Sequence, residues 1–300
     1  MSNKAATQVL LERLTETNGF SVRNSSEKDA YWYTSGKPGP FYINTENIAG
    51  EHAAEVILEN ITNLLKDNLS REHQAGAILD IINQAVDADQ AYNASIDALL
   101  DYYKLNNTYK PTIISGGERR DWFFSIPIAK KLQVPHLFLF KSGDYHITDH
   151  EGKSIELELR DMSALHVADI INLASSYLKR WIPMLQNLGV AFTETLSVAV
   201  RSQEGIDNLR KNNVSVISPL IVDRPLFTEA YNLDLINEFA FNEIGQFYDS
   251  PKDWTRHFLA ENNIEYSQAL NLDTAKKDRI EFFKSSDPYH LKSEFPLFFA

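Results

Sequence analysis

The sequence predicts an α/β fold in which helices cover both faces of a mostly parallel, twisted sheet. Between residues 111 and 218, short apolar segments typical of buried strands alternate with segments of helical periodicity, and this alternation builds βαβ units. Several of the apolar segments are followed directly by glycines or polar residues. In sheets of this kind ligands bind beyond the carboxyl ends of the strands, so these residues are the candidates for a site.

Five short apolar segments form the core of the predicted sheet: residues 111–115, 134–140, 164–169, 195–200 and 214–218. A helix around Ile126–Leu132 follows the first of them. A second helix is predicted over residues 173–188, and Pro183 inside it predicts a kink.

The segments on either side of this core are mostly helical in pattern. Apolar residues at helical spacing predict helices at 4–16 and 51–66, and one or two solvated helices at 72–104. Residues 224–300 are again helical in pattern and end in a tail rich in aromatic residues. We therefore expect a first domain of residues 1–223 with a helical insertion at about 69–108, and a helical C-terminal appendage of residues 224–300.

The overall charge and composition narrow the class of partner. The chain has 300 residues, a formal charge of −12 and no cysteine. Nucleic-acid binding relies on a basic footprint, and no basic run is present. No apolar run approaches the roughly 20 residues that span a bilayer. We therefore expect a cytoplasmic protein with neither nucleic acid nor membrane as partner, in which a polyphosphate would need a local cationic pocket or a metal ion.

Several common catalytic motifs are absent from the sequence. It contains no P-loop, no GxGxxG, no HExxH and no GxSxG motif. His146 and His150 lie near Asp144 and Asp149, but their spacing matches no closed metal site, so no protein-held metal is predicted.

The segment from Val167 to Leu178 is a candidate anion site. A strand ends at Asp169, and four short residues then lead into a helix: Asn172, Ala174, Ser175 and Ser176. Small residues let backbone N–H groups approach an anion at a helix N-terminus, and the serine hydroxyls add donors. Asp169 is placed to bind a sugar diol. An ordinary capped helix after a strand has the same pattern.

Two further segments have a binding interpretation and a structural one. Gly116 and Gly117 allow positive φ and close approach to a ligand, and Arg119 and Arg120 could bind a pyrophosphate; a flexible turn with paired charges is the alternative. Residues 20–48 contain two aromatic, extended segments joined by a turn, and the candidate binding residues run from Tyr33 to Asn44. They could stack on a planar base or pack as a hairpin on the core. Lys141 and Arg201 follow two other predicted strands.

In this order, these segments resemble the orotate phosphoribosyltransferases and, more widely, the type I phosphoribosyltransferases. The likeness runs from about residue 5 to 222, interrupted by the helical stretch at 72–104. Residues 34–44, Thr-Ser-Gly-Lys-Pro-Gly-Pro-Phe-Tyr-Ile-Asn, are similar to the hood hairpin motif Lys-Ser-Gly-x-x-Ser-Pro-aromatic-aromatic-x-Asn. Thr34 stands where that family has lysine, and the resemblance places Phe41 and Tyr42 beside the base.

Residues 165–175 are similar to the diphosphate-sugar motif of the same family, apolar-apolar-Val-Asp-Asp-Val-x-Thr-x-Gly-Thr or -Ser. Asp169 matches the second acid and Ser175 the last hydroxyl. Ala168, Asn172 and Ala174 replace the first acid, the threonine and the glycine. Ser125–Ala129 is similar to the helix start after the pyrophosphate loop, and residues 200–204 to an Asp-Arg-Gln-Glu stretch.

The resemblance also implies a flexible loop between residues 140 and 164 that closes over the leaving pyrophosphate. The family carries a Lys-x-Lys-x-His set in this loop. This chain departs from that set and has Lys141, His146, His150 and Lys153 instead.

The resemblance implies an enzyme that transfers phosphoribosyl from phosphoribosyl diphosphate to orotate or a similar nitrogenous base and releases pyrophosphate. It implies a homodimer in pyrimidine nucleotide metabolism, with Mg²⁺ bound to the substrate. Lys141, Arg119 and Asp169 would act in catalysis. The substrate-binding residues would be Ser35, Lys37, Phe41, Tyr42, Gly116, Gly117, Arg120, Asn172, Ala174, Ser175, Ser176 and Arg201. The replaced motif positions leave two alternatives: a regulatory protein that binds phosphoribosyl diphosphate or a nucleotide, or a scaffold that kept the fold.

Overall fold

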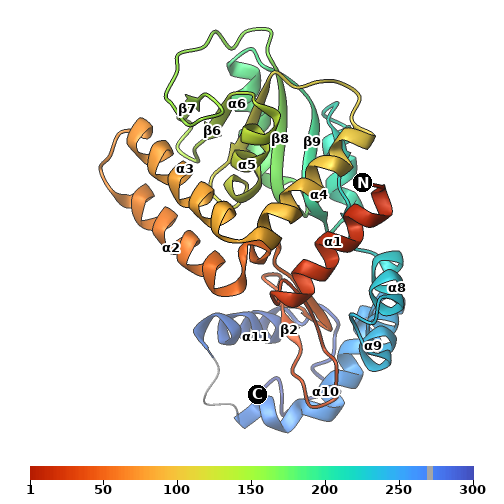
Figure 1. The fold of residues 1–300 in the computed structure, drawn as a ribbon. Coiled ribbons are helices and arrows are strands. Elements are labelled where there is room, and N and C mark those ends of the chain that lie inside the picture. Colours follow the sequence, from red (N-terminus) through yellow and green to blue (C-terminus); the bar gives the residue numbers. More distant parts are fainter. Residues whose placement is uncertain (269–272) are drawn as a thin grey trace. The chain divides into compact units, whose positions relative to one another are not determined.

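The protein, described here by a computed structural model of residues 1–268 and 273–300, forms two compact units (Figure 1). The first unit consists of residues 1–19 and 44–223, and the second of residues 20–43 and 224–300. The chain therefore divides after Asp223, but the hairpin segment 20–43, which the sequence analysis places in the first domain, groups with the C-terminal helices. No helix in the described part of the chain has both the length and the apolar character needed to cross a bilayer.

The described residues of the first unit form a seven-stranded sheet in the order β10-β9-β8-β5-β6-β7, with β11 also paired to β9. All pairs are parallel except β6–β7, so the predicted α/β class is confirmed. The strands are β5 (Ile113–Gly117), β6 (His136–Leu139), β7 (Tyr145–Thr148), β8 (Ser163–Ile171), β9 (Ala191–Val200), β10 (Ser215–Ile217) and β11 (Leu220–Ile221).

Helices cover both faces of this sheet because alternate strand residues point to opposite sides. On one face Ile113, Leu139 and Ala168 pack with Trp181 and Leu185. On the other face α5 covers the sheet, and the ring centroids of Trp122 and Phe138 are 5.7 Å apart. The covering helices are α5 (Trp122–Leu132), the π-helical turn η2 (Tyr177–Trp181), α6 (Ile182–Asn187) and α7 (Gln203–Arg210).

The predicted insertion consists of two helices, and each of them buries one face against the rest of the first unit. Ile78 and Ile82 on the first, and Ile96 and Leu99 on the second, are fully buried, and the first helix packs on α5. The hydroxyl of Tyr92 donates to the Phe123 carbonyl oxygen at 2.6 Å. The N-terminal helices of this unit are α1 (Asn3–Glu16), the 3₁₀ turn η1 (Thr45–Ala49), α2 (Glu51–Lys66), α3 (Arg71–Ala88) and α4 (Gln90–Asn106).

Two segments differ in detail from their predictions. The helix expected over 173–188 is observed as the π-helical turn η2 followed directly by α6, with the backbone helical at the junction, and Pro183 lies in the first turn of α6. The helix is therefore irregular next to Pro183, whose nitrogen has no N–H to donate. The loop expected to be flexible between residues 140 and 164 contains β7, whose residues 145–148 pair with β6.

The second unit is held together by aromatic side chains. Trp32, Trp254, Phe258, Phe283 and Phe298 are buried in one cluster. The aromatic hairpin is present as predicted, since Tyr31–Trp32 pairs antiparallel with Pro38–Gly39. The elements are β1 (Phe20–Val22), β2 (Tyr31–Trp32), β3 (Pro38–Gly39), β4 (Phe41–Ile43), α8 (Arg224–Asn232), α9 (Glu238–Asp249), α10 (Pro251–Gln268) and α11 (Thr274–Ser286).

A buried ion pair joins the hairpin segment to the C-terminal helices within this unit. The side chain of Arg23 is 2% exposed, and its Nη1 donates to Glu243 Oε2 at 2.7 Å. Its remaining donors reach the carbonyl oxygens of Ser26 and Lys28, both at 2.7 Å. This one guanidinium satisfies acceptors from both parts of the unit and, together with the aromatic cluster, joins residues 20–43 to residues 224–300.

We predict that Arg23→Ala strongly destabilises the second unit. Removing one partner of a buried pair leaves the other charge uncompensated, which costs about 3–5 kcal/mol. Calorimetric unfolding of the full chain should show this loss. The control is Arg210→Ala, where the side chain is 72% exposed and little change is expected. Equal unfolding curves for the two variants would contradict the role given to Arg23.

Candidate functional site

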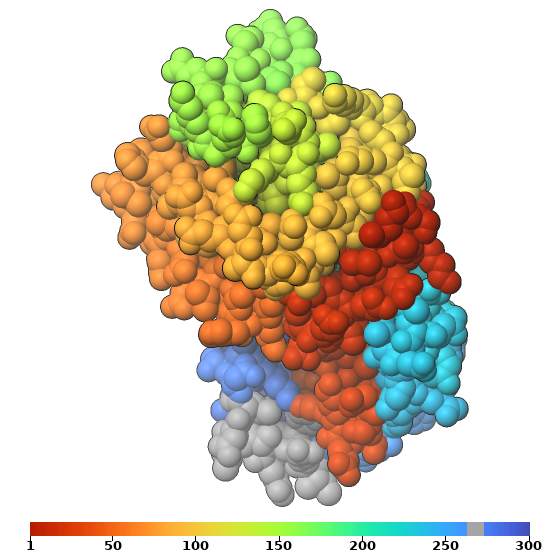
Figure 2. Space-filling model, in the orientation of Figure 1, coloured from red at the N-terminus to blue at the C-terminus, as the bar shows by residue number. Residues whose placement is uncertain are grey.

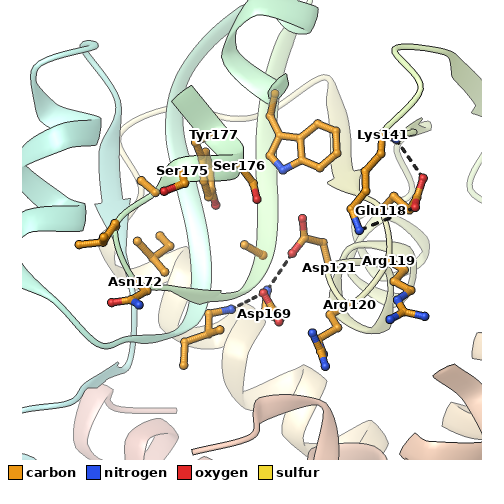
Figure 3. Close-up of a pocket in the computed structure, with 16 residues that line it drawn as sticks. Glu118, Arg119, Arg120, Asp121, Lys141, Asp169, Asn172, Ser175, Ser176 and Tyr177 are labelled. Carbon is orange, nitrogen blue, oxygen red and sulfur yellow. Dashed lines mark hydrogen bonds and ion pairs between the residues drawn. The ribbon is translucent and has the colours of Figure 1, made fainter. Parts of the chain in front are cut away.

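The first unit contains a cavity of about 360 Å³ at the carboxyl ends of β5 and β8. It is lined by residues 118–121, by Lys141, by residues 168–177 and by Trp181. Figure 3 shows Asp121 and Asp169 near the centre, with Arg119, Arg120 and Lys141 to one side and Asn172, Ser175 and Ser176 to the other. All three residues predicted to act in catalysis therefore lie around one cavity.

The carboxylate of Asp121 ties the ends of β5 and β8 together. Its Oδ2 accepts from the Gly117 N–H at 3.0 Å, and its Oδ1 accepts from the Asp169 N–H at 3.2 Å. His166, which is fully buried, places Nε2 3.4 Å from Asp121 Oδ2, and its Nδ1 lies 2.9 Å from Ser115 Oγ. Asp121 therefore sets the spacing between the two strand ends that border the cavity.

Asp169 is a half-buried carboxyl group among other acids. The Ile170 N–H donates to its Oδ1 at 2.6 Å. Burial, together with the negative charges of Asp121 and Glu46, raises the pKa of Asp169 well above its usual value. The same factors, burial first and Asp121 next, raise the pKa of the Tyr177 hydroxyl, which bonds to Thr195 Oγ1 at 2.7 Å. The floor of the cavity thus combines a carboxyl group that gains a proton readily with a neutral phenol.

The three cationic side chains at the cavity each have a partner. Lys141 donates its backbone N–H to Glu118 Oε2 at 2.9 Å, and its Nζ lies 3.8 Å from Glu118 Oε1. Arg119 donates to Thr62 Oγ1 on α2, and Arg120 pairs with Glu46. Lys141 and Arg120 remain about half exposed, so both can rotate towards an anion in the cavity.

The loop from Asn172 to Ser176 forms the opposite wall, and α7 supports it. Asn208 Nδ2 donates to the Leu173 carbonyl oxygen at 3.2 Å. A Cβ at Gly205 would lie 1.9 Å from the Asn172 carbonyl oxygen, so only glycine fits there. Ser175 and Ser176 are exposed on this wall. Ala174 has a left-handed φ of 57°.

Gly116 and Gly117 have a different role from the predicted one. Neither lines the cavity, both are buried, and neither has a left-handed φ. A Cβ at Gly116 would lie 2.0 Å from Ser125 Oγ, and one at Gly117 would lie 2.4 Å from the Trp181 ring. These glycines therefore make room for side chains of the protein and not for a ligand.

The predicted binding residues of the hairpin lie in the second unit, and they range from buried to exposed. Phe41 is buried, and its ring centroid lies 4.7 Å from that of Phe227, so the ring is used in packing and is not open to a base. Tyr42 stacks on Tyr31 at 6.1 Å, and Lys37 Nζ lies 5.2 Å from the ring centre of Tyr289. Ser35 is exposed. Of the two predictions for this segment, stacking on a base or packing within the protein, the second describes Phe41.

The remaining predicted residue, Arg201, follows β9, and its N–H donates to the Ile171 carbonyl oxygen at 2.8 Å; it does not line the cavity. Sequence reasoning missed Asp121, Tyr177, Trp181 and Gly205. The sequence signals for two of these residues were weak: Asp121 lies four residues after Gly117, and Gly205 lies four residues after Arg201. Among the described residues, no group of three or more His, Cys, Asp or Glu side chains is arranged to hold a metal ion.

Comparison with known proteins gives a match by structure. No protein-family profile and no curated protein sequence matches the chain. The UMP synthase of Leishmania donovani superposes with a TM-score of 0.53 and 12% identity. The orotate phosphoribosyltransferase of Francisella tularensis gives a TM-score of 0.50 and 12% identity, covering 80% of this chain and 96% of that enzyme. The fold is phosphoribosyltransferase-like.

The extent of the match differs between these two structures. The Leishmania comparison covers 82% of this chain but only 42% of the UMP synthase. At 12% identity the likeness describes the fold alone. In the phosphoribosyltransferase-like fold of this chain, the cavity lies at the carboxyl edge of a parallel sheet, the usual place for a ligand site.

We predict that Ala174→Gly stabilises the protein. A left-handed φ costs an L-residue roughly 1–2 kcal/mol, and glycine gives back part of this gain through its greater freedom in the unfolded chain, so the net gain is about 0.5–1 kcal/mol. Urea unfolding measures the difference. The control is Ala129→Gly inside α5, which should lose more than about 1 kcal/mol because helix propensity and a buried methyl group are both lost. Lower stability of Ala174→Gly would mean that the buried methyl group outweighs the backbone cost.

We predict that Asp169→Asn stabilises the protein near neutral pH and not in acid. The folded-state pKa of Asp169 lies well above the usual value of an aspartate, so over the intervening pH range the folded protein holds a proton that the unfolded chain releases. The resulting contribution to stability is present at low pH and is lost as the pH rises through the folded-state pKa. Asparagine has no such loss and can keep the bond from Ile170. The Tm difference between variant and native protein, measured from pH 4 to pH 8, should widen with pH. A constant difference would contradict this assignment.

Proposed function

We propose that this protein binds phosphoribosyl diphosphate in the cavity of the first unit and transfers the phosphoribosyl group to a nitrogenous base, orotate or a similar planar ring. The observation that carries the proposal is the arrangement around Asp169. Hydroxyl groups of Ser175 and Ser176 lie on one side of it, and Arg119, Arg120 and Lys141 lie on the other (Figure 3). Phosphoribosyl diphosphate has a matching order of groups: a phosphate at one end, the ribose diol in the middle and a diphosphate at the other end.

Each part of the substrate has a partner in this arrangement. The 5′-phosphate would accept from the hydroxyls of Ser175 and Ser176 and from the backbone N–H groups beside them. The ribose diol would donate to Asp169. The diphosphate would lie towards Lys141 and the two arginines, whose charges offset its own. Phosphoribosyl transfer then breaks the bond from C1 to the diphosphate oxygen, which leaves with the electron pair. A ring nitrogen of the base forms the new bond to C1 and gives up its proton to the departing diphosphate.

Charge balance explains why Mg²⁺ would enter with the substrate. Among the described residues that line the cavity, Arg119, Arg120 and Lys141 are matched by Glu118, Asp121 and Asp169. A cavity with no formal excess of positive charge favours a polyanion only weakly. A divalent cation bound to the diphosphate lowers the charge that the protein must offset. The proposed substrate is therefore the magnesium complex.

A second candidate function is a regulatory protein that binds phosphoribosyl diphosphate or a nucleotide and catalyses transfer poorly. Two observations favour it. Ala168 is buried where the resembling family has an acid, and Phe41 is enclosed by the aromatic residues of the second unit. The first removes one diol contact, and the second removes one surface for a base.

We predict that the native chain binds the magnesium complex of phosphoribosyl diphosphate in a calorimetric titration, and that Asp169→Asn weakens this binding roughly tenfold, about 1.4 kcal/mol. At a pH above the raised pKa of Asp169 the carboxylate is a charged acceptor of the diol, and asparagine replaces it by a neutral one. Asp87→Asn, the same change at an exposed position on α3, should leave the affinity unchanged.

A pyrophosphate-release assay with orotate then separates the two candidate functions. Binding with turnover supports the transferase, and binding without turnover supports the regulatory protein. Absence of binding by the native chain rejects both. An affinity that Asp169→Asn does not change would show that the diol lies elsewhere.

A further inference from the structure

The insertion helix α3 lies directly beside the turn that carries Lys141. In Figures 1 and 2 the orange helix α3 and the green segment around β7 lie side by side on the first unit. The resemblance to phosphoribosyltransferases is interrupted in this part of the sequence, so the contact belongs to this chain's own insertion. The first residue of α3 is Arg71, and its guanidinium makes most of the polar contacts to the turn.

Arg71 contacts the turn through hydrogen bonds and through stacking. Its Nε and Nη2 both donate to Asp144 Oδ2, at 3.0 and 2.8 Å, and Nη2 also donates to Ser142 Oγ at 2.8 Å. The guanidinium carbon lies 4.5 Å from the ring centre of Phe140, which is fully buried. Hydrogen bonds from Ser142 and then from Arg71 lower the pKa of Asp144. A planar group that is both stacked and hydrogen-bonded has little freedom to rotate.

The side chain of Gln74 in turn fixes the position of Arg71. The Nη1 of Arg71 donates to Gln74 Oε1 at 2.6 Å. Gln74 is 1% exposed, and its Nε2 donates to the carbonyl oxygens of Leu64 at 2.9 Å and Asp67 at 3.2 Å, at the end of α2. The anchor therefore runs from the α2–α3 connection through two side chains to the turn after β6.

The turn in its own right is closed by backbone hydrogen bonds. The Phe140 N–H donates to the Asp144 carbonyl oxygen at 3.0 Å, and the Gly143 N–H donates to the Phe140 carbonyl oxygen at 3.0 Å. Gly143 has a φ of 95°, which suits glycine. Lys141 is the residue of this turn that lines the cavity, where its N–H and Nζ face Glu118. Fixing the turn thus fixes the origin of the Lys141 side chain.

We propose that Arg71 is a positioning residue: from the insertion helix it holds the turn 140–144 so that Lys141 meets the diphosphate end of the ligand. This inference rests on the proposed function, because it assigns Lys141 a ligand. It gives the insertion a role in the site, in addition to its packing on α5. Small displacements of a charged group away from its ligand cost much of the interaction, so the loss of Arg71 should be felt at the cavity although Arg71 does not line it.

The test is a double-mutant cycle read by calorimetric binding of magnesium phosphoribosyl diphosphate. Arg71→Ala and Lys141→Ala should each weaken binding roughly five- to tenfold, and the double variant should be no weaker than Lys141→Ala alone. Arg71→Lys keeps the charge but not the planar fork, so its affinity should fall between the native value and that of Arg71→Ala. Arg210→Ala, an exposed arginine on α7, is the matched control and should bind as the native chain does.

Hydrogen exchange provides a second readout that needs no ligand. In Arg71→Ala the amides of Phe140, Lys141 and Gly143 should exchange faster, while the amides of α7 should not change. Unchanged exchange in these three amides would overturn the anchor. If the native chain binds and Lys141→Ala weakens binding but Arg71→Ala does not, the positioning role is wrong and the proposed function stands. If the native chain does not bind, the proposed function fails, and the positioning role fails with it.

Discussion

The cavity depends on one carboxylate, that of Asp121, between two neighbouring strand ends. It accepts the Gly117 N–H from β5 and the Asp169 N–H from β8, at the point where the parallel ladder between these strands has already ended. Without such an acceptor, both N–H groups would be left unpaired, which costs about 1–3 kcal/mol for each buried group. The spacing of the strand ends, and with it the width of the cavity between the cationic wall and the serine wall, follows from this bridge.

The same bridge brings several carboxyl groups together in a partly buried place, where water hydrates their negative charges poorly. Asp121, Asp169 and Glu46 are close enough that two of them raise the pKa of the third. Arg120 relieves part of this repulsion through Glu46. Acidic side chains with strongly shifted pKa values are more frequent at ligand sites than elsewhere, and they lower the stability of the folded state. Structural ion-pair networks produce such shifts as well.

Local pattern was enough to predict most elements, because helix and strand periodicity are properties of neighbouring residues. The helix expected at 51–66 is observed at Glu51–Lys66. Strand-end reasoning likewise brought Asp169 and Lys141 to one cavity. What the pattern lacks is contact between distant residues: the requirement for glycine at position 117 comes from Trp181, and Phe41 is enclosed by residues of the C-terminal helices. A glycine pair therefore suggested a ligand where the structure has an indole ring.

Strand β7 restricts the motion of the turn that carries Lys141. A free surface loop moves on nanosecond to microsecond timescales, whereas a paired strand moves only after ladder hydrogen bonds break, through local opening that is slower and rarer. Residues 145–148 pair with β6 along their whole length. The turn 140–144, which carries Lys141, therefore lies between two paired strands. A ligand would meet a backbone edge that is already in place and does not have to fold over it.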